Sequence, residues 1–383
     1  MMAVAEVPTV MVKKSNCRKA VEELLALADV RINGERPWDI RVTHSGFYER
    51  VLSNGSLGLG DSYVDGWWDC QNLDQFFYRV LRAGLEGKAA KPWQAVLMAI
   101  RARLFNLQTR KRAFQIGERH YDIGNDLFMC MLDKRMAYTC GYWKDANTLD
   151  EAQEAKLDLT CRKLGLKPGQ RILDVGCGWG SLIKFAAEKY KTSCVGITVS
   201  KEQAELGNKL CSGLPIEIRL EDYREVDEKF DHIVSLGMFE HVGAKNYRKY
   251  MKVIRRSLKD GGLFLLHTIG APNLNNERDP WIAKYIFPNS LVPNARQIVE
   301  AADGLFIVED WHNFGSDYDR TAMAWFSNFD RNWPRLKGRY NERFYRMWKY
   351  YLLSCAGAFR ARVMQLWQIV FSYGVQGGYK AIR

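Results

Sequence analysis

The chain has 383 residues, 47% hydrophobic and 26% charged, which suits two or three folded domains and excludes disorder throughout. No apolar stretch approaches the roughly 18 residues of a membrane-spanning helix, and the first residues do not resemble a signal peptide. The nine cysteines form no C-x-x-C pair, which argues against a zinc ribbon or a disulfide framework. We therefore expect no metal site and a reducing, cytoplasmic compartment.

The net charge of +12 is concentrated in two segments. Residues 79–119 carry ten Lys or Arg against two acids, and residues 331–383 carry eleven against one. Basic segments of this kind suit an anionic partner, which is either nucleic acid or an anionic lipid surface. A solvated basic face without a partner is the alternative.

Residues 1–87 predict a small α+β module that contacts a membrane or a second subunit. Apolar residues from Val21 to Ala28 recur at helical spacing. Frequent glycines predict short turns, at Gly34, Gly46, Gly55, Gly58, Gly60 and Gly66. Residues 88–115 predict a basic amphipathic linker, either a helix lying among lipid headgroups or a helix packed on the next domain.

Residues 116–383 predict one catalytic domain, in which strands and helices alternate from about residue 150. Strands are expected at 171–175, 193–197, 216–220, 232–236 and 263–267, with helices at 182–190 and 201–210. This alternation predicts an α/β fold with a doubly wound, mostly parallel sheet. Ligands of such sheets bind outside the carboxyl ends of the strands, so the turns there are candidate sites.

The turn after the first strand is rich in glycine and reads Asp174, Val175, Gly176, Cys177, Gly178, Trp179, Gly180. A dinucleotide fingerprint has glycine or alanine three residues after the second glycine, but Ser181 stands there. An acid before the turn, as Asp174 is, fits enzymes that bind S-adenosylmethionine better. We therefore predict that this turn binds S-adenosylmethionine against its glycine backbone; a structural turn without a ligand is the alternative.

The end of the second strand lacks the acid with which many methyltransferases hold the ribose of the cofactor. Thr198 and Gln203 are the candidates to supply those hydrogen bonds instead. Asp222, which follows the third strand, is the candidate acceptor for the adenine amine.

Six motifs in order resemble a known family. They are Glu118 to Phe128, Tyr138 to Trp143, Leu173 to Gly180, Met238 to Gly243, His267 to Gly270 and Tyr285 to Pro288. Together they resemble the cyclopropane-fatty-acyl-phospholipid synthases and the related mycolic acid cyclopropane synthases, from about residue 16 onwards. The resemblance implies a class I, Rossmann-like methyltransferase with S-adenosylmethionine as cofactor, and Tyr138 and Thr139 as further cofactor contacts.

The resemblance also implies a reaction. A methylene group passes from S-adenosylmethionine to the cis double bond of an acyl chain in an unsaturated phospholipid, through a carbocation that bound bicarbonate deprotonates. The bicarbonate ligands carry over to Cys140, Glu240, His267, Ile269 and Tyr318. Cys355 matches a cysteine near the site, but methylation of an alkene needs no covalent enzyme intermediate. We expect Glu240 to accept the hydroxyl proton of bicarbonate in a hydrogen bond.

Water would quench such a cation, so the chemistry needs a dry chamber. Aromatic rings gather late in the sequence, at Trp281, Tyr285, Phe287, Phe306, Trp311, Phe314, Trp325, Phe326, Phe329 and Trp333. A ring face stabilises a cation by roughly 0.5–2 kcal/mol. Core packing is the alternative for any one ring, and His120, His241 and His312 are expected to be structural.

The resemblance further implies a homodimer, peripherally bound to the anionic inner face of the cytoplasmic membrane, with no nucleic acid as partner. One rival is an N-methyltransferase of soluble amines, a class that generally lacks the Cys140 motif. A second is a nucleic-acid methyltransferase, for which we find no RNA-binding module or base-flipping motif. A third is an inactive lipid-binding homologue, against which the intact set of bicarbonate ligands argues.

Overall fold

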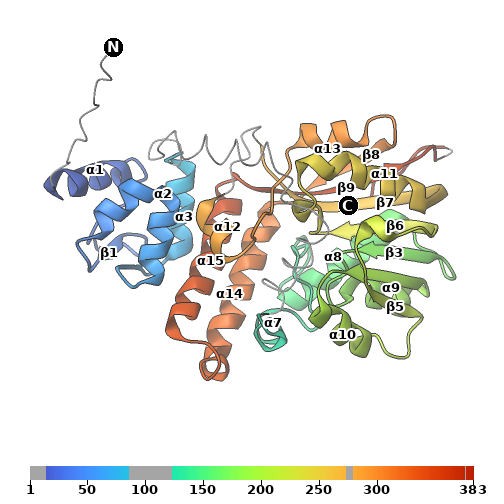
Figure 1. Ribbon diagram of the computed structural model, residues 1–383, viewed down its shortest axis with the longest axis horizontal. Coiled ribbons are helices and arrows are strands. Elements are labelled where there is room, and N and C mark those ends of the chain that lie inside the picture. The colour runs from blue at the N-terminus through green and yellow to red at the C-terminus, as the bar shows by residue number, and fades with distance from the viewer. Residues whose placement is uncertain (1–13, 86–122, 273–278, 376) are drawn as a thin grey trace, which may run out of the picture.

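A computed structural model describes residues 14–85, 123–272, 279–375 and 377–383. The larger part is built on a seven-stranded sheet in the order β5-β4-β3-β6-β7-β9-β8 (Figure 1). Its strands are β3 (Arg171–Val175), β4 (Ser193–Thr198), β5 (Ile216–Leu220), β6 (Phe230–Leu236), β7 (Leu258–Gly270), β8 (Ile307–Asn313) and β9 (Gln365–Ser372). Strands β3 to β7 are parallel, and β9 runs antiparallel between β7 and β8. The predicted parallel sheet is confirmed, whereas β8 and β9 were not predicted.

Helices cover both faces of this sheet, as a doubly wound fold requires. One face is packed against α8 (Leu149–Leu164), α9 (Ser181–Tyr190) and α10 (Lys201–Leu210). The other is packed against α11 (Tyr247–Ser257) and α13 (Ala295–Ala302). Short 3-10 helices η1 (Tyr223–Glu225), η2 (Phe239–His241) and η3 (Ala244–Asn246) flank β6 in the chain. The predicted helices at 182–190 and 201–210 are present to within one residue.

The N-terminal residues form a helical unit at the end of the molecule away from the sheet (Figure 1). It consists of α1 (Lys14–Ala26), β1 (Ile40–Val42), α2 (Phe47–Val64), β2 (Trp68–Cys70) and α3 (Leu73–Arg82), with β1 and β2 antiparallel. Between this unit and the sheet stand α14 (Ser316–Leu336) and α15 (Glu342–Arg360), beside α7 (Asn125–Met131) and α12 (Pro280–Tyr285). A single hydrophobic cluster runs through the N-terminal unit and these four helices.

The predicted turns at Gly58 and Gly60 are wrong, because both glycines lie inside α2, whereas Gly55 does interrupt this helix. Gly55 has a φ of +55° and kinks the helix. A Cβ atom on Gly60 would lie 2.3 Å from the indole of Trp281 on α12. Gly60 therefore allows α2 and α12 to approach each other closely. In the local sequence, the same glycine suggests a turn.

The predicted linker at 88–115 lies outside the described residues, as does His120, so the domain boundaries at 87 and 115 stay predictions. Within the described ranges, no helix combines the length and the apolar character needed to cross a membrane.

Candidate active site at the carboxyl edge of the sheet

The glycine turn leaves β3 at the carboxyl edge of the sheet. The backbone N–H groups of Gly176 and Cys177 donate to the carbonyl oxygen of Ile197 on β4, at 2.9 and 3.0 Å. Gly176 has a φ of +85°, and a Cβ atom there would lie 2.7 Å from the Cβ of Met238. Trp179 donates from its indole to Asn125 on α7, at 2.8 Å, and so ties the turn to the neighbouring helix. The turn is therefore fixed in a shape that only glycine tolerates.

Asp174 lies buried on β3, directly before this turn. One of its carboxylate oxygens, Oδ1, has no hydrogen-bond partner among the described residues. Burial raises the pKa of Asp174 to about 7, and the charge of Lys156 opposes that shift. An unpartnered buried carboxylate oxygen is costly, so it fits a site in which the bound cofactor supplies a hydrogen-bond donor.

Lys156 on α8 is a buried residue that the sequence analysis did not single out. Its Nζ donates to the hydroxyl of Thr139 at 2.9 Å. Burial lowers the pKa of Lys156 to about 8, while Asp133, Cys140 and Asp174 oppose the shift. Lys156 thus links the predicted cofactor contact Thr139 with the acid before the glycine turn. The sequence marks the start of this helix by the Thr148 capping box, but it does not distinguish Lys156 from the other lysines.

The polar residues predicted for ribose lie together at the end of β4. The Thr198 hydroxyl donates to the Gln203 side chain at 2.8 Å, and Ser200 caps α10 by accepting from the Gln203 backbone. The residue predicted for adenine, Asp222, accepts from the backbone and the guanidinium of Arg224, at 3.0 and 2.7 Å. These oxygens already have a protein partner, and the cofactor contacts of Thr198, Gln203 and Asp222 stay predictions.

Glu240 lies in η2, directly beyond the end of β6, and is buried. Its Oε1 accepts from the backbone N–H of Ile269 at 2.6 Å, and its Oε2 has no partner among the described residues. Burial raises the pKa of Glu240 to about 7, and the hydrogen bond from Ile269 opposes the shift. The carboxyl group therefore changes between its neutral and ionised forms near neutral pH.

His267 lies inside β7 and not at its end, because pairing with β9 extends that strand to Gly270. It is still level with Leu236, the last residue of β6, and so at the carboxyl edge of that strand. Burial lowers the pKa of His267 well below its usual value, and the charges of Lys156 and Lys163 lower it further. The ring is therefore neutral, and its Nε2 has no partner among the described residues.

Cys140, Ile269 and Tyr318 share one small apolar cluster. The Cys140 thiol donates to the Gly141 carbonyl at 3.1 Å, and burial raises its pKa far above the usual value. Tyr318 stacks on Phe359 with ring centroids 4.4 Å apart, and burial raises the pKa of its phenol. Both groups are therefore protonated; the thiol hydrogen of Cys140 is used within the protein, and the phenol of Tyr318 can offer a hydrogen-bond donor to this part of the site.

Cys355 and Tyr138 lie beside the site on its α15 side. The Tyr138 hydroxyl is 2.9 Å from that of Tyr351, one turn before Cys355 on α15. Burial raises the pKa of the Cys355 thiol to about 12. A thiol with such a pKa is a poor nucleophile at neutral pH.

The aromatic rings of the predicted chamber fall into separate groups. Phe306 and Trp311 pack on the face of the sheet that α11 and α13 cover, and are core residues. Most of the others belong to the cluster around α12, α14 and α15: Trp281, Tyr285, Phe287, Trp325, Phe326, Phe329 and Trp333. His241 packs beside this group, with its ring edge against Phe287 and a pKa that burial lowers to about 4. Its Nδ1 is buried without a partner among the described residues, so its structural role stays a prediction.

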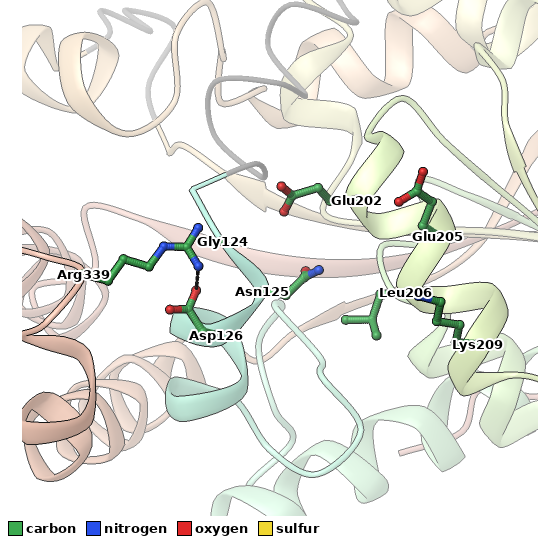
Figure 2. A pocket seen from close by; sticks show the side chains of 8 residues that line it. All are labelled: Gly124, Asn125, Asp126, Glu202, Glu205, Leu206, Lys209 and Arg339. Atoms are coloured by element: carbon green, nitrogen blue, oxygen red, sulfur yellow. Dashed lines mark hydrogen bonds and ion pairs between the residues drawn. The ribbon is translucent and has the colours of Figure 1, made fainter.

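An open pocket of about 350 Å³ lies between α7 and α10, and Figure 2 shows the side chains that line it. Glu202, Glu205 and Lys209 line it from α10, opposite the Asp126–Arg339 ion pair of 3.0 Å. A lining with this much charge does not suit a hydrocarbon chain. The pocket is therefore not the predicted acyl chamber.

The doubly wound sheet and its glycine turn define a class I, S-adenosylmethionine-dependent methyltransferase. Residues 108–369 match the family model described as mycolic acid cyclopropane synthetase. The cyclopropane-fatty-acyl-phospholipid synthase of Escherichia coli strain K12 is 54% identical over 374 residues, which cover 98% of both chains. The chain therefore belongs to the cyclopropane synthase family.

Two solved structures support this assignment. The cyclopropane synthase MmaA2 of Mycobacterium tuberculosis superposes with a TM-score of 0.66 at 29% identity, over 70% of this chain and all of that one. The mycolic acid cyclopropane synthase CmaA1, complexed with SAH and CTAB, gives a TM-score of 0.65 at 32% identity, over 68% of this chain and 98% of that one.

Proposed function

We propose that the chain is a cyclopropane-fatty-acyl-phospholipid synthase, which adds a methylene group to the cis double bond of a phospholipid acyl chain. The relative that matches 98% of the chain supports the substrate class. The observation that carries the mechanism is a pair of buried atoms without a partner among the described residues, Glu240 Oε2 and His267 Nε2, with the other Glu240 oxygen held by the backbone N–H of Ile269. Such a set of polar groups fits a small anion with both donor and acceptor oxygens, as bicarbonate is.

When bound, S-adenosylmethionine supplies the one-carbon group and bicarbonate supplies the base. The residues of the chain bind and orient these two groups, and they exclude water from the site. Asp174 and the glycine turn hold the cofactor at the end of β3, and Glu240 and His267 orient the anion. Apolar neighbours such as Phe314 keep water from a cationic centre, which would otherwise be hydrated to an alcohol. Glu240 Oε2 would accept the hydroxyl hydrogen of a bound bicarbonate, whose other oxygens would then be available as the base.

Mass spectrometry of lipids tests the reaction. The protein is incubated with S-adenosylmethionine and vesicles of an unsaturated phospholipid, with a soluble amine added to the same mixture. We expect the mass of the phospholipid to rise by about 14 Da, which is one methylene group from S-adenosylmethionine. The number of rings plus double bonds in the acyl chain should stay unchanged. A methylated amine, or a saturated methyl-branched lipid, would contradict the proposal.

We further propose peripheral binding to an anionic membrane surface, though with a smaller basic area than the sequence suggests. Five of the eleven basic residues in 331–383 are in ion pairs with acids elsewhere: Arg339, Arg343, Arg346, Arg360 and Arg383. Sedimentation with anionic vesicles should weaken as salt rises, because salt screens the attraction. Salt-independent sedimentation would contradict this.

We also propose that the chain forms a homodimer, which analytical ultracentrifugation tests.

A further inference from the structure

Three polar side chains form a row across the sheet beneath α8. His267 on β7 is the cross-strand neighbour of Gln368 on β9, and Gln368 is also the neighbour of His312 on β8. The face of α8 toward this row carries Thr160 and Lys163, both buried polar residues. His267, Gln368 and Thr160 have no access to water, so each hydrogen bond they make is to another group of the protein or to a ligand. Among the described residues, Gln368 Oε1 and His267 Nε2 have no such partner.

The hydrogen bonds of Thr160 fix the orientation of the Gln368 amide. The Thr160 hydroxyl donates to the backbone carbonyl of Lys156 at 2.8 Å, one helical turn earlier. A hydroxyl has a single hydrogen, so toward Gln368 the Thr160 oxygen acts only as an acceptor. Gln368 Nε2 lies 3.1 Å from that oxygen. The reversed amide would place two oxygens without a hydrogen against each other.

The same amide nitrogen fixes the proton on His267. Gln368 Nε2 has a second hydrogen and lies 3.4 Å from Nδ1 of His267. A ring nitrogen that accepts a hydrogen bond carries no hydrogen, so the neutral ring carries its hydrogen on Nε2. This Nε2–H is buried and unpartnered among the described residues, as is the acceptor Oε2 of Glu240. The two side chains therefore offer one donor and one acceptor to a ligand.

We propose that Gln368, held by Thr160, is a positioning residue that fixes His267 in the Nε2–H tautomer, so that His267 donates a hydrogen bond to the bound anion. This inference rests on the proposed function, in which bicarbonate accepts the departing proton. The opposite tautomer would direct the Nε2 lone pair at the oxygens of an anion and repel it. His267 thus acts as an electrostatic partner of the anion and not as the base.

Nitrogen NMR of the intact protein tests the tautomer without any substrate. The protein has six histidines, and with ¹⁵N-labelled histidine the signals of His267 are assigned by their loss in His267→Gln. We expect the shift of an unprotonated nitrogen at Nδ1 and of a protonated one at Nε2. A wild-type spectrum with a protonated Nδ1 would overturn the proposal.

Variants of the two positioning residues test the cause. Gln368→Met removes the donor at similar volume, and Thr160→Val frees the amide to turn, so both should move the His267 signals toward a mixture of tautomers. Thr160→Ser keeps the hydroxyl and should restore the wild-type signals. An unchanged tautomer in both Gln368→Met and Thr160→Val would contradict the positioning role.

Bicarbonate dependence gives a second readout, in buffers freed of carbon dioxide. Loss of a hydrogen bond to a charged group in Gln368→Met should raise the half-maximal bicarbonate concentration about tenfold or more. Affinity for S-adenosylmethionine should change less than about threefold, because the cofactor side is untouched. Gln365→Met, at the start of the same strand, is the matched control and should behave as wild type. If the wild type forms no cyclopropane product, the proposed function fails, while the NMR spectra still decide the tautomer.

Discussion

The two sides of the candidate site satisfy their polar groups in different ways. On the cofactor side, side chains largely bond to one another, as Thr198 does to Gln203, and Asp174 Oδ1 is the exception among them. On the anion side, Glu240 and His267 come from different segments, and each keeps one buried polar atom unpartnered among the described residues. An unsatisfied buried polar group costs about 1–3 kcal/mol. The unpartnered atoms of the anion side therefore destabilise the protein while no ligand is bound. A ligand that satisfies both atoms therefore gains most on the anion side.

The largest effects on turnover are expected on the anion side, where Glu240 and His267 each have an unpartnered buried atom among the described residues. Glu240→Gln removes the anionic acceptor and His267→Ala removes the donor, so each should lower turnover at least about 100-fold. Affinity for S-adenosylmethionine should stay within a few-fold, as measured by equilibrium dialysis. Glu300→Gln, an exposed ion-pair partner on α13, is the control. Near-normal turnover of either site variant would show that the assignment of the anion side is wrong.

Asp174→Asn should show the reverse pattern and so sharpen the comparison. Loss of a charged hydrogen-bond acceptor should weaken cofactor binding by roughly 10- to 100-fold, with a smaller effect on turnover at saturating cofactor. Dialysis and initial rates separate the two quantities. Asp260→Asn, exposed near the start of β7, is the matched control. If turnover at saturation fell as far as in Glu240→Gln, the two sides would not act separately.

The pH dependence of turnover follows from the raised pKa of Glu240, which is about 7. In the ionised carboxylate, Oε2 is an acceptor while Oε1 keeps its bond from Ile269, so turnover should rise as pH increases through about 7. Asp174 also has a pKa of about 7, so variants have to distinguish them. The residual activity of Glu240→Gln should lose the inflection, while Asp174→Asn at saturating cofactor should keep it. The opposite result would assign the titration to the cofactor side.

This difference between the two sides also explains what the sequence could predict. The cofactor turn is a contiguous segment after one strand, so strand periodicity and glycine spacing locate Asp174 and Gly176 directly. Cys140, Glu240 and Tyr318 lie far apart in the chain, and no spacing rule relates them. They were found only through the resemblance of separate motifs to a family.

Other features were missed because they depend on partners that the sequence does not show. Lys156 is one lysine among many until its bond to Thr139 is seen, and Gln368 lies on a strand that was not predicted. The strand β9 escaped because its apolar run follows a long helix and has no alternating helix–strand pattern around it. The sequence overestimates how many basic residues in 331–383 lack an acidic partner, because partners such as Asp65 lie on the distant N-terminal unit.

A smaller effect is expected in the packing that supports the anion side. Gly60→Ala would bring a Cβ atom to 2.3 Å from the indole of Trp281, which packs against the ring of Tyr350 on α15. Overpacking of this kind should lower the free energy of unfolding by about 1–3 kcal/mol, measured by urea denaturation. Gly338→Ala has no atom within 4 Å of its Cβ and should be close to neutral. Cofactor affinity should be unchanged in both, and a loss in Gly60→Ala would couple the N-terminal unit to the cofactor side.

The smallest effect is expected for Cys355, although its side chain lies one helical turn from Tyr351 beside the site. Burial raises the pKa of its thiol to about 12, so the nucleophilic thiolate is rare at neutral pH, and an alkene that attacks a methyl group needs no covalent link to the enzyme. Cys355→Ala should therefore lower turnover by less than about threefold, the order of a lost packing contact. Cys355→Ser tests size and polarity separately. A loss as large as that of Glu240→Gln would give the thiol a part in the chemistry and place a third reacting group on the α15 side.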